Sequence, residues 1–133
     1  MKLVSSLLCE AANTMPDGRF NILGGGINDV HVIQFPVNIK LCIILRFELF
    51  LTTEGKHDVE VNMIDGDGRQ VIKPFNMTFN VNPKKRFANF VIDIGQLKIP
   101  EAGMYSFEVS FDKKHLQSLP LEAKQHEKHQ GNK

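Results

Sequence analysis

The 133-residue chain has no tryptophan, a single tyrosine and only two cysteines. It has no apolar run of about 18 residues, so no segment is expected to span a bilayer. Its 16 basic and 15 acidic residues leave a formal net charge of +1, which gives no electrostatic reason to expect nucleic acid or an anionic membrane as a partner. The scarcity of tryptophan and tyrosine also argues against a sugar-binding surface, which usually offers exposed aromatic platforms.

The two cysteines, Cys9 and Cys42, both lie in apolar sequence with strand character. The apolar stretch before Cys9 is short and interrupted by two serines, and leucines stand where a lipoprotein cleavage site needs a small residue. We therefore interpret it as a first β-strand of a cytoplasmic, intracellular protein. Its cysteines are then expected to be reduced and to pack as small hydrophobes. A disulfide between them is the alternative.

The most regular pattern in the chain begins after Gly103. Tyr105, Phe107, Val109 and Phe111 alternate with residues that are mostly polar, and this period of two residues predicts a half-buried antiparallel β-strand. The glycine two residues before the tyrosine resembles the tyrosine corner of immunoglobulin-like sandwiches, in which the phenol ties a loop back to the strand.

Almost every other segment also has the pattern of a strand. Proline, glycine and aspartate punctuate the alternating segments, for example at 15–18, 52–56 and 65–68. A glycine triplet at 24–26 predicts a bulge or a strand that switches sheets. Two finer predictions are a returning hairpin arm at 69–73 and a short helical turn at 95–102. Further strands are expected at 3–9, 20–23, 27–35, 41–51, 59–63, 75–81, 90–94 and 115–121.

This spacing of short strands predicts an all-β fold, an immunoglobulin-like antiparallel β-sandwich of about eight or nine strands. Residues 1–122 are expected to form a single sandwich domain, with ten phenylalanines in the chain supplying bulk for its core. The polar segment 123–133 contains almost no apolar residue and is expected to be a disordered tail.

Two resemblances extend these predictions. Residues 41–121 resemble a generic immunoglobulin-like sandwich, with Phe107 at the position of the disulfide cysteine of antibody domains. Nearly the whole chain resembles a family of small bacterial proteins of unknown function, on the strings at 7–12 and 17–26, the Asp67-Gly68 hairpin and the Gly-x-Tyr strand. Because that family has no assigned activity, the resemblance supplies no catalytic residue. It implies a bacterial intracellular protein.

Possible metal and phosphate sites are better interpreted as turns. The Asp65-Gly66-Asp67-Gly68 string invites a calcium site, but an EF-hand loop would need a further oxygen ligand at Arg69 and a glutamate at Asn76. The glycine triplet could cradle a phosphate only if a helix followed it, and a strand is expected there. We assign no metal, cofactor or catalytic residue, and expect no enzyme.

The histidines give only weak evidence for a metal site, and the basic segment gives only weak evidence for a nucleic acid site. His126 and His129 have the spacing of metal ligands on a helix, but they fall in the tail. His31 is expected to face solvent. The basic segment 84–86, followed by Phe87, could contact nucleic acid through charge and stacking. A three-residue basic loop in a chain of net charge +1 is more often a solvated turn, so we expect no nucleic acid partner.

The remaining signal is surplus apolar surface. The second face of the 41–51 strand carries Cys42, Ile44 and Phe50, and Val91 and Ile33 are also out of phase with their polar neighbours. These five residues either form an exposed interface or are covered by loops or the N-terminal segment. We therefore expect a non-enzymatic interaction module that binds a protein partner or itself. The alternative is a small-ligand or metal-binding module that uses loops at one end of the sandwich.

For that alternative, the candidate residues are Asp65, Asp67 and His57. Both aspartates lie in the turn at 65–68, and carboxylate and imidazole are common metal ligands.

Overall fold

A computed structural model describes residues 1–50, 54–82 and 84–126. Within these residues the chain is all-β, with nine strands in two sheets. No described segment forms a helix long and apolar enough to cross a membrane. The strands are β1 (Lys2–Thr14), β2 (Phe20–Gly25), β3 (Asp29–Val32), β4 (Val37–Glu48), β5 (Gly55–Asp65), β6 (Phe75–Val81), β7 (Phe87–Ile99), β8 (Gly103–Phe111) and β9 (Lys114–Gln125).

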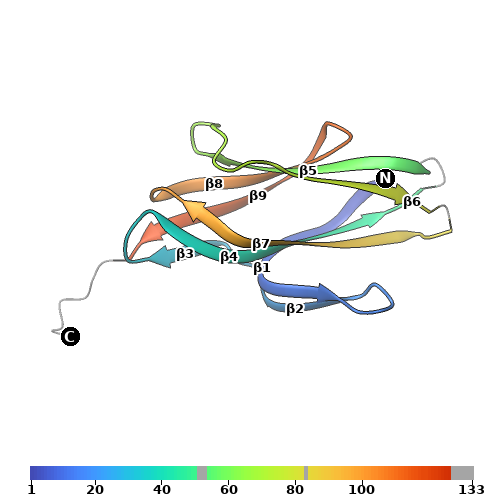
Figure 1. Ribbon diagram of the computed structural model, residues 1–133, viewed down its shortest axis with the longest axis horizontal. Helices are drawn as coiled ribbons and strands as arrows, with labels where there is room; N and C mark the ends of the chain where they lie inside the picture. The colour runs from blue at the N-terminus through green and yellow to red at the C-terminus, as the bar shows by residue number, and fades with distance from the viewer. Residues whose placement is uncertain (51–53, 83, 127–133) are drawn as a thin grey trace.

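The two sheets have the strand orders β2-β1-β4-β7 and β3-β9-β8-β5-β6. We call them sheet A and sheet B, and Figure 1 shows β5, β6 and β8 of sheet B above the β4 and β7 strands of sheet A. The expected antiparallel arrangement is wrong at one position, because β3 pairs with β9 in parallel. Only residues 26–28 connect β2 of sheet A to β3 of sheet B, so the direction of β3 is set by the direction in which the chain leaves β2.

The alternating apolar residues form the core between the sheets, as the sequence predicts. Tyr105, Phe107 and Val109 of β8 are buried. Leu45 and Phe47 of β4 lie opposite them and have no exposed surface. Because consecutive strand residues point to opposite faces, β4 and β8 each pack one face into this core.

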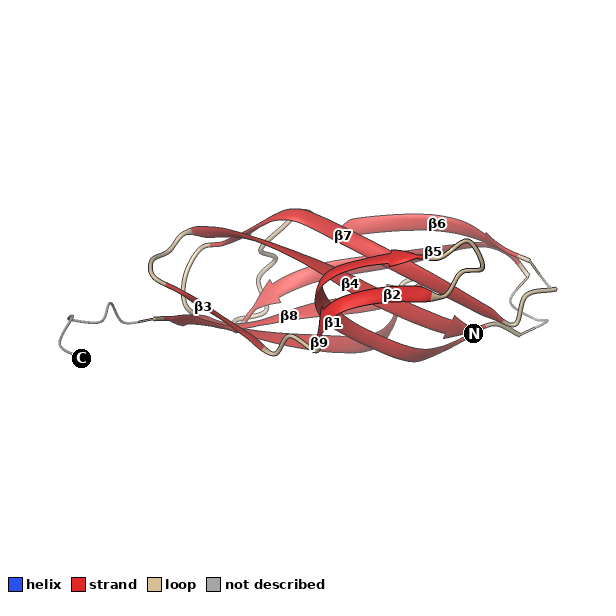
Figure 2. Ribbon diagram, turned by 90° about the horizontal axis from the view of Figure 1, so that it is seen from below, coloured by secondary structure: helices blue, strands red, loops and turns tan. Residues whose placement is uncertain are grey.

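The hairpin of β1 and β2 covers the outer face of sheet A. The first part of β1 pairs with β4, and its second part pairs with β2. Figures 1 and 2 show β2 on the side of sheet A that faces away from sheet B. A second apolar cluster forms beneath the hairpin, in which Phe20 packs against Cys9, Cys42 and Ile44.

The glycine triplet marks the point where the chain leaves sheet A for sheet B. A change of sheet is one of the two alternatives expected there, and a bulge is the other. Gly24 and Gly26 have positive φ angles of 62° and 89°, which favour glycine. The amides of Gly26 and Ile27 both donate to the carbonyl oxygen of Leu8. Two successive donors on one acceptor are typical of an irregularity at the end of a strand pair.

The helical turn expected at 95–102 is wrong, because β7 continues to Ile99. The register changes from Leu41↔Ile94 to Ile39↔Leu97, so β7 carries one residue more than β4 between these pairs. This bulge shifts the phase of the alternation from Ile92 and Ile94 to Leu97 and Ile99. The sequence therefore loses its period of two where the strand continues.

Two further boundaries differ from expectation. Residues 69–73 do not form a strand, because only an isolated bridge joins Ile64 to Gln70. β9 extends to Gln125 and buries Ala123 in the core, so the expected start of the tail at 123 is three residues too early. The expected end of the apolar strand at Leu51, the turn residues 52–53 and the tail at 127–133 lie outside the described residues.

Candidate functional site

A groove with a volume of about 610 Å³ lies where the turn of the β1–β2 hairpin approaches the adjoining ends of β4, β6 and β7. We call it the basic groove, because Arg19, Arg46, Lys85 and Arg86 line it. These four cations come from three segments that are far apart in the sequence. The fold therefore concentrates positive charge in one place, although the whole chain has a net charge of only +1.

Two carboxylates partly balance this charge. Arg19 Nε lies 2.7 Å from Asp17 Oδ2, and Arg86 lies 3.4 Å from Glu48 Oε2. Among the described residues, Arg46 and Lys85 have no carboxylate within ion-pair distance. Four cations and two carboxylates leave two positive charges in the groove to be matched by a ligand.

Phe87 organises the cations at the end of β7. The guanidinium carbon of Arg46 lies 4.3 Å from the centre of the Phe87 ring, and that of Arg86 lies 5.7 Å away. A guanidinium over an aromatic face is attracted by the ring quadrupole and keeps its hydrogen-bond donors in the plane around it. The arrangement can therefore hold a carboxylate against Arg46 without first breaking an ion pair.

Asn89 fixes both Arg46 and the hairpin turn. Asn89 lies opposite Arg46 in the β4–β7 register, and its Oδ1 accepts a hydrogen bond of 3.0 Å from Arg46 Nη1. Its Nδ2 donates to the carbonyl oxygen of Gly18 at 2.8 Å. One side chain thus joins β4, β7 and the turn, all of which line the groove.

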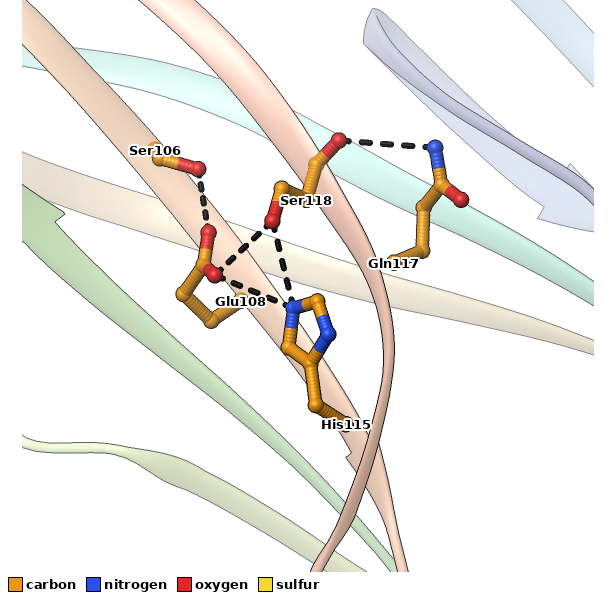
Figure 3. A network of polar contacts seen from close by, with 5 residues as sticks. All are labelled: Ser106, Glu108, His115, Gln117 and Ser118. Carbon is orange, nitrogen blue, oxygen red and sulfur yellow. Dashed lines mark hydrogen bonds and ion pairs between the residues drawn. The ribbon is translucent and has the colours of Figure 1, made fainter.

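A second polar cluster lies on the outer face of sheet B (Figure 3). Glu108 accepts hydrogen bonds from Ser106 and, at 2.8 Å, from Ser118. Nε2 of His115 lies 3.0 Å from Glu108 Oε1 and 3.1 Å from Ser118 Oγ. Partial burial raises the pKa of Glu108, but the two serine hydrogen bonds and His115 outweigh it and hold the pKa below its usual value.

This cluster contains a serine, a histidine and a carboxylate, but it lacks the geometry of a catalytic triad. In a triad the histidine uses one ring nitrogen for the serine and the other for the carboxylate. Here the same Nε2 meets both groups, and the Ser118 hydroxyl donates to Glu108. The hydroxyl proton therefore already has an acceptor, and the arrangement holds β8 and β9 together.

The sequence does not predict this cluster, because a bulge brings its residues together. His115 and Ser118 are three residues apart, so strict alternation places them on opposite faces. The register changes from Val109↔Gln117 to Ser110↔His115, which adds one residue to β9 and brings His115 to the face of Ser118. No sequence signal marks this bulge.

The five residues predicted as a possible interface do not form one surface. Cys42 and Ile44 are buried in the cluster beneath the β1–β2 hairpin, and Val91 packs against them. Of the two alternatives for Cys42 and Ile44, exposure is wrong, and the structure shows the other, in which the N-terminal hairpin covers that face of β4. Phe50 and Ile33 are exposed, but they lie beyond opposite ends of β4, a strand of roughly 40 Å at about 3.3 Å per residue.

The three candidate ligand residues do not lie at one end of the two-sheet fold. His57 lies near the start of β5 and Asp65 lies at its end, so roughly 27 Å of strand separates them. Asp65 Oδ1 accepts hydrogen bonds from the amides of Asp67 and Arg69, as expected for a hairpin turn. Nδ1 of His57 lies 2.6 Å from Asp112 Oδ2.

The described residues contain no group of three or more His, Cys, Asp or Glu side chains that could hold a metal ion. The side chain of His31 is 51% exposed, as expected. Its ring lies edge-on to that of His126, 6.3 Å from centre to centre. His129 lies outside the described residues.

The geometry thus defines a two-sheet β protein with a cationic surface groove. Its described residues contain no cluster of metal-ligating side chains. The chain belongs to the DUF6941 family, a family of unknown function, which it matches over residues 4–124. No curated protein matches it. Among solved structures, a beta-glucosidase from Listeria innocua, crystallised with gluconolactone, is similar to it with a TM-score of 0.46 and 9% identity. That alignment covers 93% of this chain and 16% of the enzyme chain.

Proposed function

We propose that the protein is a non-enzymatic interaction module that binds an acidic segment of a protein partner in the basic groove. The observation that carries the proposal is the position of Arg46, which lies over Phe87 with no carboxylate partner among the described residues. Arginine presents a planar fork of donors that matches a carboxylate in two parallel hydrogen bonds. Lys85 and Arg86 add charge at the rim of the same groove.

An acidic protein segment suits the groove better than nucleic acid does. Nucleic acid binding usually needs a long basic surface, with roughly six to ten phosphate contacts, whereas only two charges remain unmatched here. The groove also offers an exposed phenylalanine and the amides of Asn80 and Asn82. This mixture of charge, aromatic surface and amide donors suits a peptide with carboxylate side chains.

A small anionic ligand is the second candidate. The groove volume of about 610 Å³ lies within the range of roughly 300–1,000 Å³ that is common for small-molecule sites. In this case the cations would bind the anionic group, and Phe87 would contact the apolar part of the ligand.

We also propose a cytoplasmic setting and an immunoglobulin-like sandwich. Cys9 and Cys42, opposite each other on β1 and β4, are free thiols in an apolar cluster, which suits a reducing compartment. The hydrogen bond from the Tyr105 phenol to the carbonyl oxygen of Glu101 supports the immunoglobulin-like assignment.

Fluorescence polarisation with a labelled peptide of alternating glutamate and valine tests the binding proposal. The matched peptide carries glutamine in place of glutamate. We expect binding of the glutamate peptide only, weakened by salt, and roughly tenfold weaker for Arg46→Gln. Arg69→Gln is the control, because Arg69 is exposed at the 65–68 turn, outside the groove.

Equal binding of the two peptides would contradict the proposal. So would a single-stranded oligonucleotide that binds more tightly than the glutamate peptide at the same salt concentration. A thermal-shift screen with small dicarboxylates and inorganic phosphate addresses the second candidate, which fails if none of them stabilises the protein at millimolar concentration.

A further inference from the structure

The strand that carries Phe87 and Asn89 is an edge strand. β7 pairs with β4 on one side and is the last strand of sheet A on the other. It is 13 residues long, whereas the other edge strands β2, β3 and β6 have 6, 4 and 7 residues. A long edge strand presents a row of backbone donors and acceptors that can pair with another chain.

The register identifies which backbone groups face outward. The amide of Leu49 donates to the carbonyl oxygen of Arg86 at 2.6 Å, so these two residues form a hydrogen-bonded pair at the end of the β4–β7 ladder. In an antiparallel pair, hydrogen-bonded and non-hydrogen-bonded positions alternate. The N–H and C=O groups of Phe87, Asn89 and Val91 therefore point away from β4.

This part of the edge lacks the usual protection against strand pairing. Edge strands are commonly blunted by proline, lysine or inward-pointing charge, but residues 87–92 contain no proline and no charged residue. Asp93 is the first charged side chain along β7. The unprotected part thus begins at the basic groove and ends at Asp93.

The cations of the groove lie on the face that an added strand would share. Phe87 and Asn89 project on the same face as Arg46, since Arg46 contacts both side chains. The Arg46 guanidinium extends from β4 to the ring of Phe87, and so reaches toward the outer edge of the sheet. Side chains directly opposite each other on adjacent strands lie about 4.5–5.5 Å apart. A carboxylate opposite Phe87 or Asn89 would therefore meet Arg46 or Arg86.

We propose that the acidic segment binds as an additional β-strand along the edge of β7 at residues 87–93, with its carboxylates on the face of Arg46 and Arg86. This inference rests on the proposed function and specifies the binding mode and the partner: an extended acidic stretch of another protein. In β-strand addition, backbone hydrogen bonds supply affinity and alternate side chains supply specificity. The two unmatched charges of the groove supply the preference for carboxylates.

A second copy of this chain is a poorer occupant. Pairing β7 with the β7 strand of another copy would bring only Asp93 as a carboxylate within the unprotected part of the edge. The positive charge of both grooves would then remain unmatched. Charge complementarity therefore favours a separate acidic segment.

Two N-methylated isomers of the glutamate–valine peptide test the binding mode. In a β-strand the amides of alternate residues point to the same edge, so methylating the glutamate amides blocks one edge and methylating the valine amides blocks the other. Both isomers keep the same charge. We expect one isomer to bind about tenfold more weakly than the unmodified peptide and the other to bind equally well.

Equal binding by both isomers, or equal weakening of both, would overturn strand addition. If the unmodified glutamate peptide still binds better than the glutamine peptide in that case, the proposed function stands alone. If it does not, the proposed function fails as well. Light scattering is measured on the free protein, and a dimer that the glutamate peptide does not dissociate would assign the β7 edge to a second copy.

Hydrogen exchange of the full chain locates the binding edge independently. We expect the amides of Phe87, Asn89 and Val91 to exchange about tenfold more slowly with saturating glutamate peptide. The amides of β3, an edge strand of sheet B whose residues do not line the groove, are the internal reference and should not change. Protection of β6 or β3 instead of β7 would contradict the inference.

Discussion

The phenol of Tyr105 donates a hydrogen bond of 2.6 Å to the carbonyl oxygen of Glu101. The tyrosine ring is buried in the core, and the carbonyl belongs to the turn between β7 and β8. This bond joins the point where the chain leaves sheet A to the strand at which it enters sheet B. It satisfies a polar group that would otherwise be buried at the rim of an apolar core.

The first prediction concerns this bond. Tyr105→Phe removes the hydroxyl but keeps the ring, and it should lower the free energy of unfolding by about 1 kcal/mol. Tyr105→Ala also removes the ring and should cost about 3–5 kcal/mol. Urea denaturation followed by circular dichroism measures both. A neutral Tyr105→Phe variant would show that the bond contributes nothing to stability.

The second prediction concerns the glycine at the crossing between the sheets. Gly24→Ala places a Cβ at a φ of 62° and within 2.7 Å of Glu10 Cγ. Since the Glu10 side chain can move, the backbone conformation should dominate, at a cost of about 1–2 kcal/mol. Gly95→Ala is the matched control, because no atom lies within 4 Å of its added Cβ.

Thermal denaturation of the two alanine variants should therefore separate them. We expect Gly95→Ala to keep or slightly raise the melting temperature, since alanine restricts the unfolded chain. An equal fall in melting temperature in both variants would show that the positive φ at Gly24 does not account for the effect of the substitution.

The third prediction is a pH dependence of stability. The pKa of Glu108 is lower in the folded protein than its ordinary value of 4.5, so the ionised carboxylate stabilises the fold. This contribution is complete above the unfolded pKa and is lost as the pH falls through the folded pKa. The free energy of unfolding should therefore fall between about pH 5 and pH 3 more steeply in the wild type than in Glu108→Gln.

Urea denaturation at a series of pH values measures this difference. Glu60→Gln is the control, because Glu60 is an exposed glutamate on β5, which pairs with β8. The interpretation fails if Glu60→Gln flattens the pH profile as much as Glu108→Gln does.

The fourth prediction concerns thiol reactivity. Burial raises the pKa of both Cys9 and Cys42, and the thiolate is the reactive form. Both thiols should therefore react slowly with a disulfide reagent at pH 8 in the folded protein and rapidly in urea. Phe20→Ala removes a side chain that covers them and should accelerate the reaction. Rapid labelling of the wild type without urea would contradict the covering role of the β1–β2 hairpin.

The sequence predicts the strands wherever alternation is unbroken. Phe107 and Val109 in β8, and Leu45 and Phe47 in β4, are buried as their period of two indicates. It fails at the bulge near Gly95, where one additional residue reverses the phase and β7 resembles a turn. A bulge depends on how two strands pair, and a single segment of sequence carries little information about pairing.

The candidate site could not be predicted for the same reason. Arg19, Arg46 and Arg86 come from segments separated by at least 27 residues, and each is an ordinary charged residue in its local sequence. Asn89 joins Arg46 to the hairpin turn at Gly18 through two hydrogen bonds, and these residues are distant in the sequence. Likewise, Cys42 and Ile44 have the pattern of an exposed face until the β1–β2 hairpin folds over them.

The sequence alone thus determines an all-β chain with a buried alternating core, because side-chain direction in a strand follows from local backbone geometry. It also determines the turn at Asp65 and an interruption of the strand at the glycine triplet, where local hydrogen bonds and positive φ angles decide the conformation. It leaves open whether the chain bulges or changes sheet at that triplet. The tertiary structure decides which strands are edges, which apolar faces are covered and which charges meet. These properties depend on contacts between residues distant in the chain, and only the folded pairing of the strands creates them.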